Sequence, residues 1–376
     1  MQTQARTFGI LTFAAVVCFT ASLARAATVT NAWTGGGAGD QNWSTAGNWS
    51  GGALSGEDFV RFTDEAVAGT IGSSGTPDNT LDTSQTIQGL YVLNTNTPTG
   101  AGHTTLISPG ASLVVTGSVN PVVWIGTGVD SGAAATNYTT ILGAGSIAIS
   151  NTDGDFTVRQ NSANSGAHRA TLDMTGLDTF TVSVRRVSVG DSTGSAGYNN
   201  RAAATVMLAK TNVIACYRGT TAQDLIIGQG QSQAGNGTLY LGQTNAIFSD
   251  AGLTVGRQKC TAWLGFNTNI VMDNPFALFR DLAGTGPQSQ WQIGEHASNG
   301  TGTGNRGTAD FSYGTVDALV NVMYIGRGQT GVADSGTTAA GRGTLSFTKG
   351  VIDANTLNIG YQRYDGAPGQ GWVYVD

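Results

Sequence analysis

The sequence predicts an all-β fold, a right-handed parallel β-helix in which each coil holds about three short strands. Two observations lead to this prediction. The composition suits many short strands joined by tight turns, because the chain holds 56 glycines and is rich in threonine and asparagine. A short signature, read as apolar, any residue, apolar and then glycine, also recurs at intervals of about 28–38 residues.

The signature marks one strand of each repeat unit. A polar segment of variable length follows it, then a second short strand such as TLYL (Thr238–Leu241), and then a third apolar patch such as AIF (Ala246–Phe248). A degenerate copy, FTVR at Phe156–Arg159, lacks the glycine. The complete copies are VWIG at Val123–Gly126, VSVG at Val187–Gly190, LIIG at Leu225–Gly228, LTVG at Leu253–Gly256, WQIG at Trp291–Gly294, MYIG at Met323–Gly326 and LNIG at Leu357–Gly360.

Stacking of equivalent strands would give these units a common core. Helical repeats need a period of 3.6 residues, and propeller blades need four strands, so both fit the pattern less well. In a parallel β-helix the third signature positions form one interior ladder, which is Ile125, Val158, Val189, Ile227, Val255, Ile293, Ile325 and Ile359. The first positions form a second ladder, which is Val123, Phe156, Val187, Leu225, Leu253, Trp291, Met323 and Leu357.

The residues between the two ladders are expected to face solvent, since side chains alternate along a strand. They are Trp124, Thr157, Ser188, Ile226, Thr254, Gln292, Tyr324 and Asn358. The glycine after each strand suggests a tight bend with positive φ, a rule from which Arg159 departs.

The domain organisation begins with an export signal at residues 1–26. Arg6 supplies the positive region, Phe8–Leu23 the apolar run and Ala24–Ala26 the small residues of a cleavage site. Residues 27–57 are expected to form a Trp- and Gly-rich amino-terminal cap. Residues 58–376 form the β-helix, which we expect to continue beyond the end of this chain. The expected location is extracellular or at the outer cell surface.

Three tryptophans, Trp33, Trp43 and Trp49, lie among glycines, serines and asparagines just before the first predicted strands. These strands are 58–62, 87–93, 104–107 and 112–115. The favoured interpretation is a lid over the first coil, because the open end of a repeat array must be capped. The alternative is a glycan-stacking surface that uses Trp43 and Trp49.

The segment WTGGGAGDQNWSTAGNWSGG, the following SGEDFVRF and the later TLISPGASLVVTG carry a family resemblance. Over about residues 28–120 the chain resembles the amino-terminal start of bacterial autotransporter-type passenger proteins and related secreted β-strand-repeat proteins. The resemblance implies a surface-exposed or secreted right-handed β-helix, often an adhesin or stalk without enzymatic activity. The chain departs from that family because no translocating barrel or sorting tail is recognisable.

Charge and ligand chemistry exclude several partners. The net charge of −6 argues against nucleic acid and against an anionic membrane surface. No stretch after the signal is long and apolar enough for a membrane span. The residues His103, His168 and His296 follow no metal-ligand spacing, so neither a metal nor a cofactor is expected. Cys216 and Cys260 lie at different phases of the repeat, which favours free thiols over a disulfide.

Two short motifs are candidates for catalysis, one with a carboxylate and one with two basic residues. Asn151–Gly154 reads NTDG, similar to a motif of galacturonan hydrolases, but the paired carboxylates that glycoside hydrolysis needs are missing, so it is interpreted as a turn. A polysaccharide lyase needs basic residues, and the only basic pair, Arg185-Arg186, is interpreted as an exposed strand edge.

The position after each signature glycine carries Asp191, Gln229, Arg257, Glu295, Arg327 and Tyr361. Stacked coils would align Arg257, Glu295 and Arg327 into a surface ion-pair ladder. The alternative is a site in which Glu295 and His296 share acid–base work, or contact a glycan.

The sequence therefore favours a non-catalytic, exported, adhesin-like β-helix that acts as a stalk or display scaffold. The alternative is a carbohydrate-binding or polysaccharide-degrading β-helix, either a pectinase-like hydrolase or a lyase. The partners consistent with both are a glycan or a host or cell surface.

Overall fold

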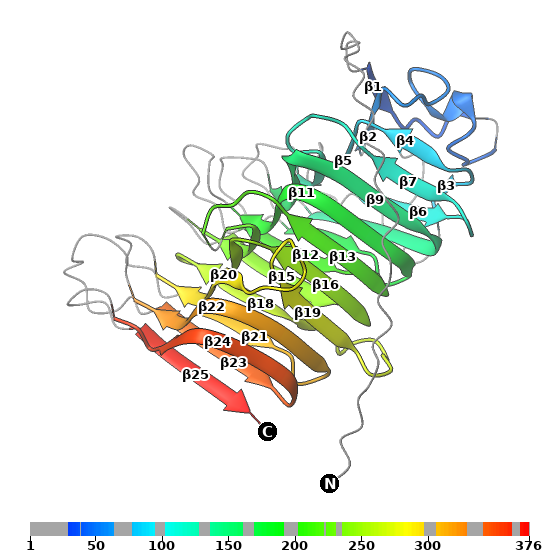
Figure 1. The fold of residues 1–376 in the computed structure, drawn as a ribbon. Helices are drawn as coiled ribbons and strands as arrows, with labels where there is room; N and C mark the ends of the chain where they lie inside the picture. Colours follow the sequence, from blue (N-terminus) through cyan, green and yellow to red (C-terminus); the bar gives the residue numbers. More distant parts are fainter. Residues whose placement is uncertain are drawn as a thin grey trace.

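The computed structural model is all-β, and the 25 strands among its described residues are connected by parallel pairing (Figure 1). It describes residues 29–37, 39–63, 77–94, 102–127, 136–160, 169–191, 202–221, 223–230, 235–296, 306–328, 341–362 and 369–375. The one helical element in these ranges is a 3-10 turn, η1 (Ala46–Asn48). The predicted signal, residues 1–26, and His168 lie outside the described residues.

The strands fall into three rows, and each strand pairs with its equivalent in the next unit. The signature row consists of β1 (Val29–Ala32), β2 (Asp58–Thr63), β5 (Gly89–Asn94), β8 (Val123–Thr127), the ends of β9 (Thr136–Gln160) and β11 (Leu177–Asp191), β14 (Leu225–Gln229), β17 (Gly252–Arg257), β20 (Gln288–Glu295), and the ends of β22 (Thr315–Arg327) and β24 (Lys349–Ile359).

The second row follows the signature row along the chain. It consists of β3 (Asn79–Leu81), β6 (Thr104–Ile107), the start of β9, β10 (Arg169–Asp173), β12 (Ala202–Met207), β15 (Gly235–Leu241), β18 (Thr261–Phe266), β21 (Arg306–Asp310), β23 (Gly341–Phe347) and β25 (Gly369–Val375).

The third row leads back to the next signature strand. It consists of β4 (Gln85–Ile87), β7 (Ser112–Val115), the middle of β9, the start of β11, β13 (Thr211–Cys216), β16 (Thr244–Ser249), β19 (Phe276–Arg280), and the starts of β22 and β24. The strands of the three rows lie side by side from the amino-terminal end to β25 (Figure 1). The predicted all-β architecture with parallel strand pairing is thereby confirmed.

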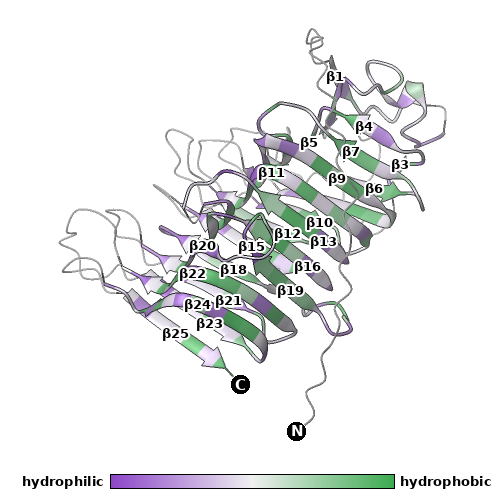
Figure 2. Cartoon of the chain, viewed as in Figure 1, coloured by the Kyte–Doolittle hydropathy of each residue, from purple (hydrophilic) through white to green (hydrophobic). Residues whose placement is uncertain are grey.

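The two apolar ladders of the signature row form in the predicted register. Each third position pairs with the next, from Ile125 with Val158 through to Ile325 with Ile359, and each first position does the same. All members up to Ile325 and Met323 are buried. At about 1.5–3 kcal/mol for each fully buried aliphatic side chain, the ladders are a major stabilising term. Figure 2 shows the alternation of hydrophobic and hydrophilic residues along the strands.

The column between the ladders does not face solvent, so that prediction is wrong for most of its members. Five of its residues are buried, namely Thr157, Ser188, Ile226, Thr254 and Gln292. Polar side chains from the position after the glycine return over this column. Asp191 accepts a hydrogen bond from the Ser188 hydroxyl (3.5 Å), and Glu295 contacts Gln292. Both faces of these strands are therefore covered.

The signature glycines turn the chain as predicted. Six of them, Gly190, Gly228, Gly256, Gly294, Gly326 and Gly360, have φ between +65° and +74°. At Gly294 a side chain would also overlap the carbonyl oxygen of Arg342. Gly126 is the exception among the seven, because its φ is not positive and it stays paired with Arg159 in a continuous register.

The two ends of the strand rows differ. At the amino-terminal end, β1 pairs with β2 and the indoles of Trp33, Trp43 and Trp49 are buried. At the other end, the last ladder member Ile359 is 49% exposed. Among the described strands, β24 and β25 have an equivalent partner on one side only, which leaves apolar side chains uncovered.

Candidate functional site

Glu295, a member of the predicted ion-pair ladder and of the alternative acid–base site, ends strand β20 and is only 2% exposed. Its Oε2 atom lies 3.1 Å from Nε of Arg257 on one neighbouring strand. Its Oε1 atom lies 3.2 Å from a terminal guanidinium nitrogen of Arg327 on the other. The predicted ion-pair ladder is therefore present, but its carboxylate is buried and its two arginines are half-buried rather than fully on the surface.

Further contacts hold this ladder in place. In the amide orientation that satisfies both of its ends, Gln292 donates to Oε2 of Glu295 at 2.6 Å and accepts from Arg327 at 3.0 Å. The guanidinium of Arg327 lies over the ring of Tyr324, 4.4 Å from its centroid, as in a cation–π contact. Both oxygens of this carboxylate are therefore engaged by guanidinium groups or an amide, and burial keeps them from solvent.

His296, the other predicted acid–base residue, is also buried, directly after β20. Its backbone amide donates to the carbonyl of Arg327 at 3.0 Å. Burial places both Glu295 and His296 away from any glycan on the surface. The geometry assigns Glu295 to the packing between neighbouring strands of the signature row.

A second ionic cluster lies closer to the amino terminus. The buried carboxylate of Asp155 accepts two hydrogen bonds from Arg185 (2.8 and 2.9 Å) and one from Arg186 (2.8 Å). Arg186 also pairs with Asp191 at 3.1 Å. The prediction that Arg185-Arg186 is an exposed strand edge is therefore wrong, because a register shift between Val184 and Arg186 lets both side chains reach Asp155.

The NTDG motif lies within β9 rather than between strands. The backbone amide of Asp153 donates to Oδ1 of Asn151 at 3.0 Å, which is the hydrogen bond of an Asx turn. Asp153 itself is exposed, and the nearest carboxylate along the chain, Asp155, is occupied by the two arginines. The motif therefore shapes the strand locally.

The tryptophans form a buried cluster with Phe62 of β2. Trp33 and Trp43 each lie about 5 Å from Trp49 (5.0 and 5.2 Å between ring centroids), and all three contact Phe62. Trp43 is 1% exposed, and its Nε1 atom donates to Oδ1 of Asn79 at 2.8 Å. Trp43 and Trp49 are 1% and 4% exposed, so neither offers a ring face on which a sugar could stack in this structure.

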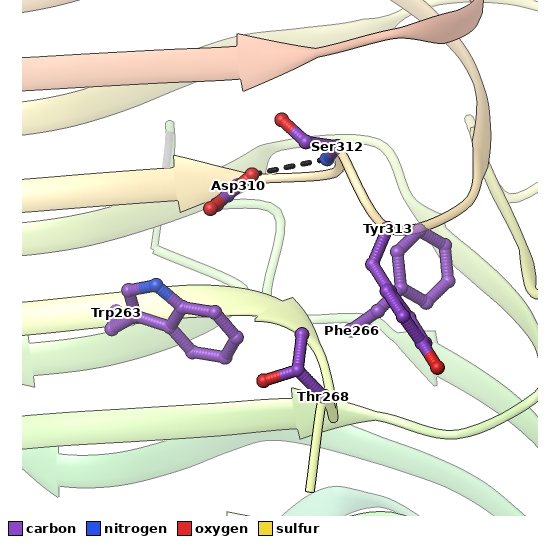
Figure 3. Close-up of a pocket in the computed structure, with 6 residues that line it drawn as sticks. All are labelled: Trp263, Phe266, Thr268, Asp310, Ser312 and Tyr313. Carbon is purple, nitrogen blue, oxygen red and sulfur yellow. Dashed lines mark hydrogen bonds between the residues drawn. The ribbon is translucent and has the colours of Figure 1, made fainter. Parts of the chain in front are cut away.

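A shallow pocket of about 250 Å³ lies at the ends of β18 and β21, on the outward face of the second row (Figure 3). We call it the aromatic pocket; its lining residues are Trp263, Phe266, Thr268, Asp310, Ser312 and Tyr313. Figure 3 shows Trp263 on one side and Tyr313 on the other, with Thr268 between them. Asp310 projects from the adjacent strand, and its Oδ1 accepts a hydrogen bond from the Ser312 amide at 3.0 Å.

No pattern in the sequence predicts this pocket, because its residues come from two units. Trp263 and Tyr313 approach each other only because β18 pairs with β21, which aligns Trp263 with Thr308 and Gly265 with Asp310. The one available signal was a tryptophan at an outward position of a strand, in TAWLGF.

The remaining candidates are structural. Cys216 and Cys260 are both buried free thiols, so they are not joined. Across the described ranges, no group of three or more His, Cys, Asp or Glu residues could hold a metal ion. The same ranges contain no helix with the length and apolarity of a membrane span. Comparisons with protein-family models, with curated proteins and with solved structures gave no match.

Proposed function

We propose that this chain is an exported, non-catalytic right-handed parallel β-helix, an adhesin-like scaffold of the bacterial cell surface or secretome. The observation that carries the proposal is the unbroken register of the signature strands, from Ile125 with Val158 to Ile325 with Ile359. A chain in which every unit docks on the previous one extends as it grows, and extension is what a stalk supplies. The likeness of residues 28–120 to autotransporter-type passengers supports the same role.

The length differences between units favour display. The segments that follow the signature glycines vary in length, while the strands on either side keep their pairing. Insertions at such positions have a small free-energy cost, so the units can carry segments of different length while the paired strands stay constant. The tryptophan cluster is proposed to cap the first coil, because its indoles cover Phe62 of β2.

The alternative of a polysaccharide-cleaving enzyme has less support. Glycoside hydrolysis needs one carboxyl group that donates a proton and a second that acts as base or nucleophile. Glu295 and Asp155 are both engaged by arginines, and Asp153 forms part of a local turn. None of these carboxylates lines the aromatic pocket.

Small-angle X-ray scattering tests the scaffold. Residues 295–326, one complete unit, would be duplicated in tandem and compared with the parent chain. A stacked rod should lengthen by about 4.8 Å, the spacing between paired strands, with an unchanged cross-section. A thicker particle of unchanged length would refute the proposal.

Export is tested separately by expressing the full chain in a bacterial host. The exported product should begin at Ala27, and an Ala26→Arg variant should keep the first 26 residues and remain inside the cell. Equal export of the parent chain and the Ala26→Arg variant would contradict the proposed extracellular location.

A further inference from the structure

We infer that the aromatic pocket binds one ring of a neutral glycan, which stacks on Trp263 and donates hydroxyl hydrogen bonds to Asp310. This adds a ligand to the proposed scaffold but does not depend on it, because binding and particle length are measured independently. Three properties of the pocket support it: the position of the indole, the polar groups beside it and the charge of its surroundings.

The indole of Trp263 lies along the sheet surface. A Cβ atom on Gly265, two residues further along the strand, would come within 2.7 and 2.8 Å of Cζ2 and Cη2 of that ring. The benzene half of the indole therefore covers the glycine, where any larger side chain would lift it away. Tyr240 supports the ring from the preceding strand, with centroids 4.7 Å apart at an interplanar angle of 49°.

This arrangement leaves the outer face of the indole open to the pocket. Trp263 is partly exposed, unlike the fully enclosed Trp43 and Trp291. Tyr313, 43% exposed, forms the opposite wall, and the buried ring of Phe266 lies beside it in the lining. A flat aromatic face held rigid by the sheet matches the C–H face of a pyranose, and preorganisation lowers the entropic cost of binding.

Polar groups beside the indole fit sugar hydroxyls. Among the described residues, the Ser312 amide is the one hydrogen-bond partner of the Asp310 carboxylate, and it occupies a single oxygen. The second oxygen is available to accept from a ligand. Thr268 and Ser312 are exposed hydroxyls at the rim, and both can donate or accept. A few fixed polar groups around an apolar platform give a small-molecule site its orientation.

The charge of the pocket selects a neutral ligand. Asp310 is the only charged residue in its lining, so a uronate, a phosphate or a nucleic acid would meet a like charge. The pocket of about 250 Å³ lies just below the usual range of small-molecule sites, which suits a single ring of a longer chain.

A neighbouring pocket provides an internal contrast. It measures about 340 Å³, lies over β21, β23 and β25, and is lined by residues that include Arg306, Arg342 and Trp372. Its position along the same face follows from the register, which aligns Trp263 with Thr308, Thr344 and Trp372 in successive strands. The two arginines would favour an acidic sugar there, so acidic and neutral glycans should separate the two pockets.

Isothermal titration calorimetry of the mature chain tests the assignment. The probes are the neutral hexasaccharides cellohexaose, mannohexaose, xylohexaose and laminarihexaose, with hexagalacturonate as the acidic comparison. We expect at least one neutral probe to bind, and Trp263→Ala to weaken its affinity by about tenfold or more, as for other buried aromatic anchors. Asp310→Asn should weaken the same probe while leaving the indole in place. Tyr138→Ala is the matched control, because Tyr138 is an exposed aromatic residue of the same row, away from the pocket.

Each outcome decides the proposal. Thermal unfolding is measured for every variant to show that it folds. If Trp263→Ala does not fold, binding by Asp310→Asn tests the proposal instead. The inference is overturned if no neutral probe binds, or if binding persists unchanged in both pocket variants. It is also overturned if only hexagalacturonate binds and Arg342→Gln abolishes that binding, which would place the ligand in the neighbouring pocket. In each of these cases the scattering result on the duplicated unit still decides the scaffold.

Discussion

The indole nitrogen of Trp49 donates a hydrogen bond to the backbone carbonyl of Trp43 at 2.8 Å, inside a cluster with no exposed ring face. The side chains of the tryptophan cluster thus fix the path of the glycine-rich segment that carries them. Large apolar residues among glycines are explained by this arrangement, because the glycines let the backbone bend while the indoles supply the core.

Trp43 is expected to be the most sensitive position of the cluster. Trp43→Ala should lower the free energy of unfolding by about 3–5 kcal/mol, since it leaves a cavity beside Phe62. Trp43→Phe should lose about 1–3 kcal/mol, because the Asn79 oxygen loses its donor while much of the ring remains. Urea denaturation measures both, with the exposed Tyr217→Ala as control. Similar losses at Trp43 and Tyr217 would argue against a packed cluster.

Glu295 is expected to stabilise the stack through its two arginines. Glu295→Gln leaves Arg257 and Arg327 facing each other across a neutral amide in a buried site, and should lower the free energy of unfolding by about 3 kcal/mol. Asp317→Asn is the matched control, since Asp317 pairs with Arg280 but is 41% exposed, and its loss should stay within about 1 kcal/mol. Urea midpoints that shift equally would show that burial of the ladder contributes nothing.

Gly294 is expected to tolerate no side chain. Gly294→Ala forces a left-handed backbone on alanine and also drives Cβ into the carbonyl of Arg342. We therefore expect the free energy of unfolding to fall by well more than the backbone conformation alone would cost. Gly219→Ala isolates that cost, because Gly219 has φ of +68° with no atom near the added Cβ. Gly219→Ala should lower the free energy of unfolding by about 1–2 kcal/mol. Thermal unfolding compares the two, and a ranking in the other order would contradict the stacked geometry.

The buried thiols are expected to make the protein sensitive to alkaline pH. Burial raises the pKa of Cys216 and Cys260 above the ordinary value of 9.0, so both stay protonated in the folded chain. Above about pH 9 the unfolded chain loses these protons and the folded chain keeps them. Stability should therefore fall as pH rises, by up to about 1.4 kcal/mol per pH unit for each thiol.

Urea denaturation at a series of pH values from 8 to 10 measures this slope, and the Cys216→Ala/Cys260→Ala variant should show a shallower one. Neither thiol should react with a thiol reagent until the chain is unfolded. Rapid labelling of the folded protein would contradict the buried placement of both residues.

The sequence predicted those features that repeat. The signature residues mark equivalent positions in every unit, so their register follows once parallel stacking is assumed, and the pairing of Val255 with Ile293 is an example. Features that occur once were missed. The burial of Ser188 and Gln292 depends on polar side chains that fold back over the strand, and a period-2 pattern cannot show this.

The candidate sites were predictable to different degrees. The alignment of Arg257, Glu295 and Arg327 could be read from their common position after the glycine. Their burial could not, since charged residues usually lie outside. The aromatic pocket needs Trp263 and Tyr313 to meet across two units, and only the exact pairing of β18 with β21 brings them together.

The alternation of charge along the ladder also bears on how such a chain avoids folding wrongly. The units are so similar that the apolar ladders alone would also allow a wrong pairing, in which one unit is left out of the stack. If the unit of Glu295 were left out, Arg257 would lie directly against Arg327, two cations without an anion between them. The carboxylate thus favours the correct docking order of neighbouring units, which the interchangeable isoleucines and valines cannot do.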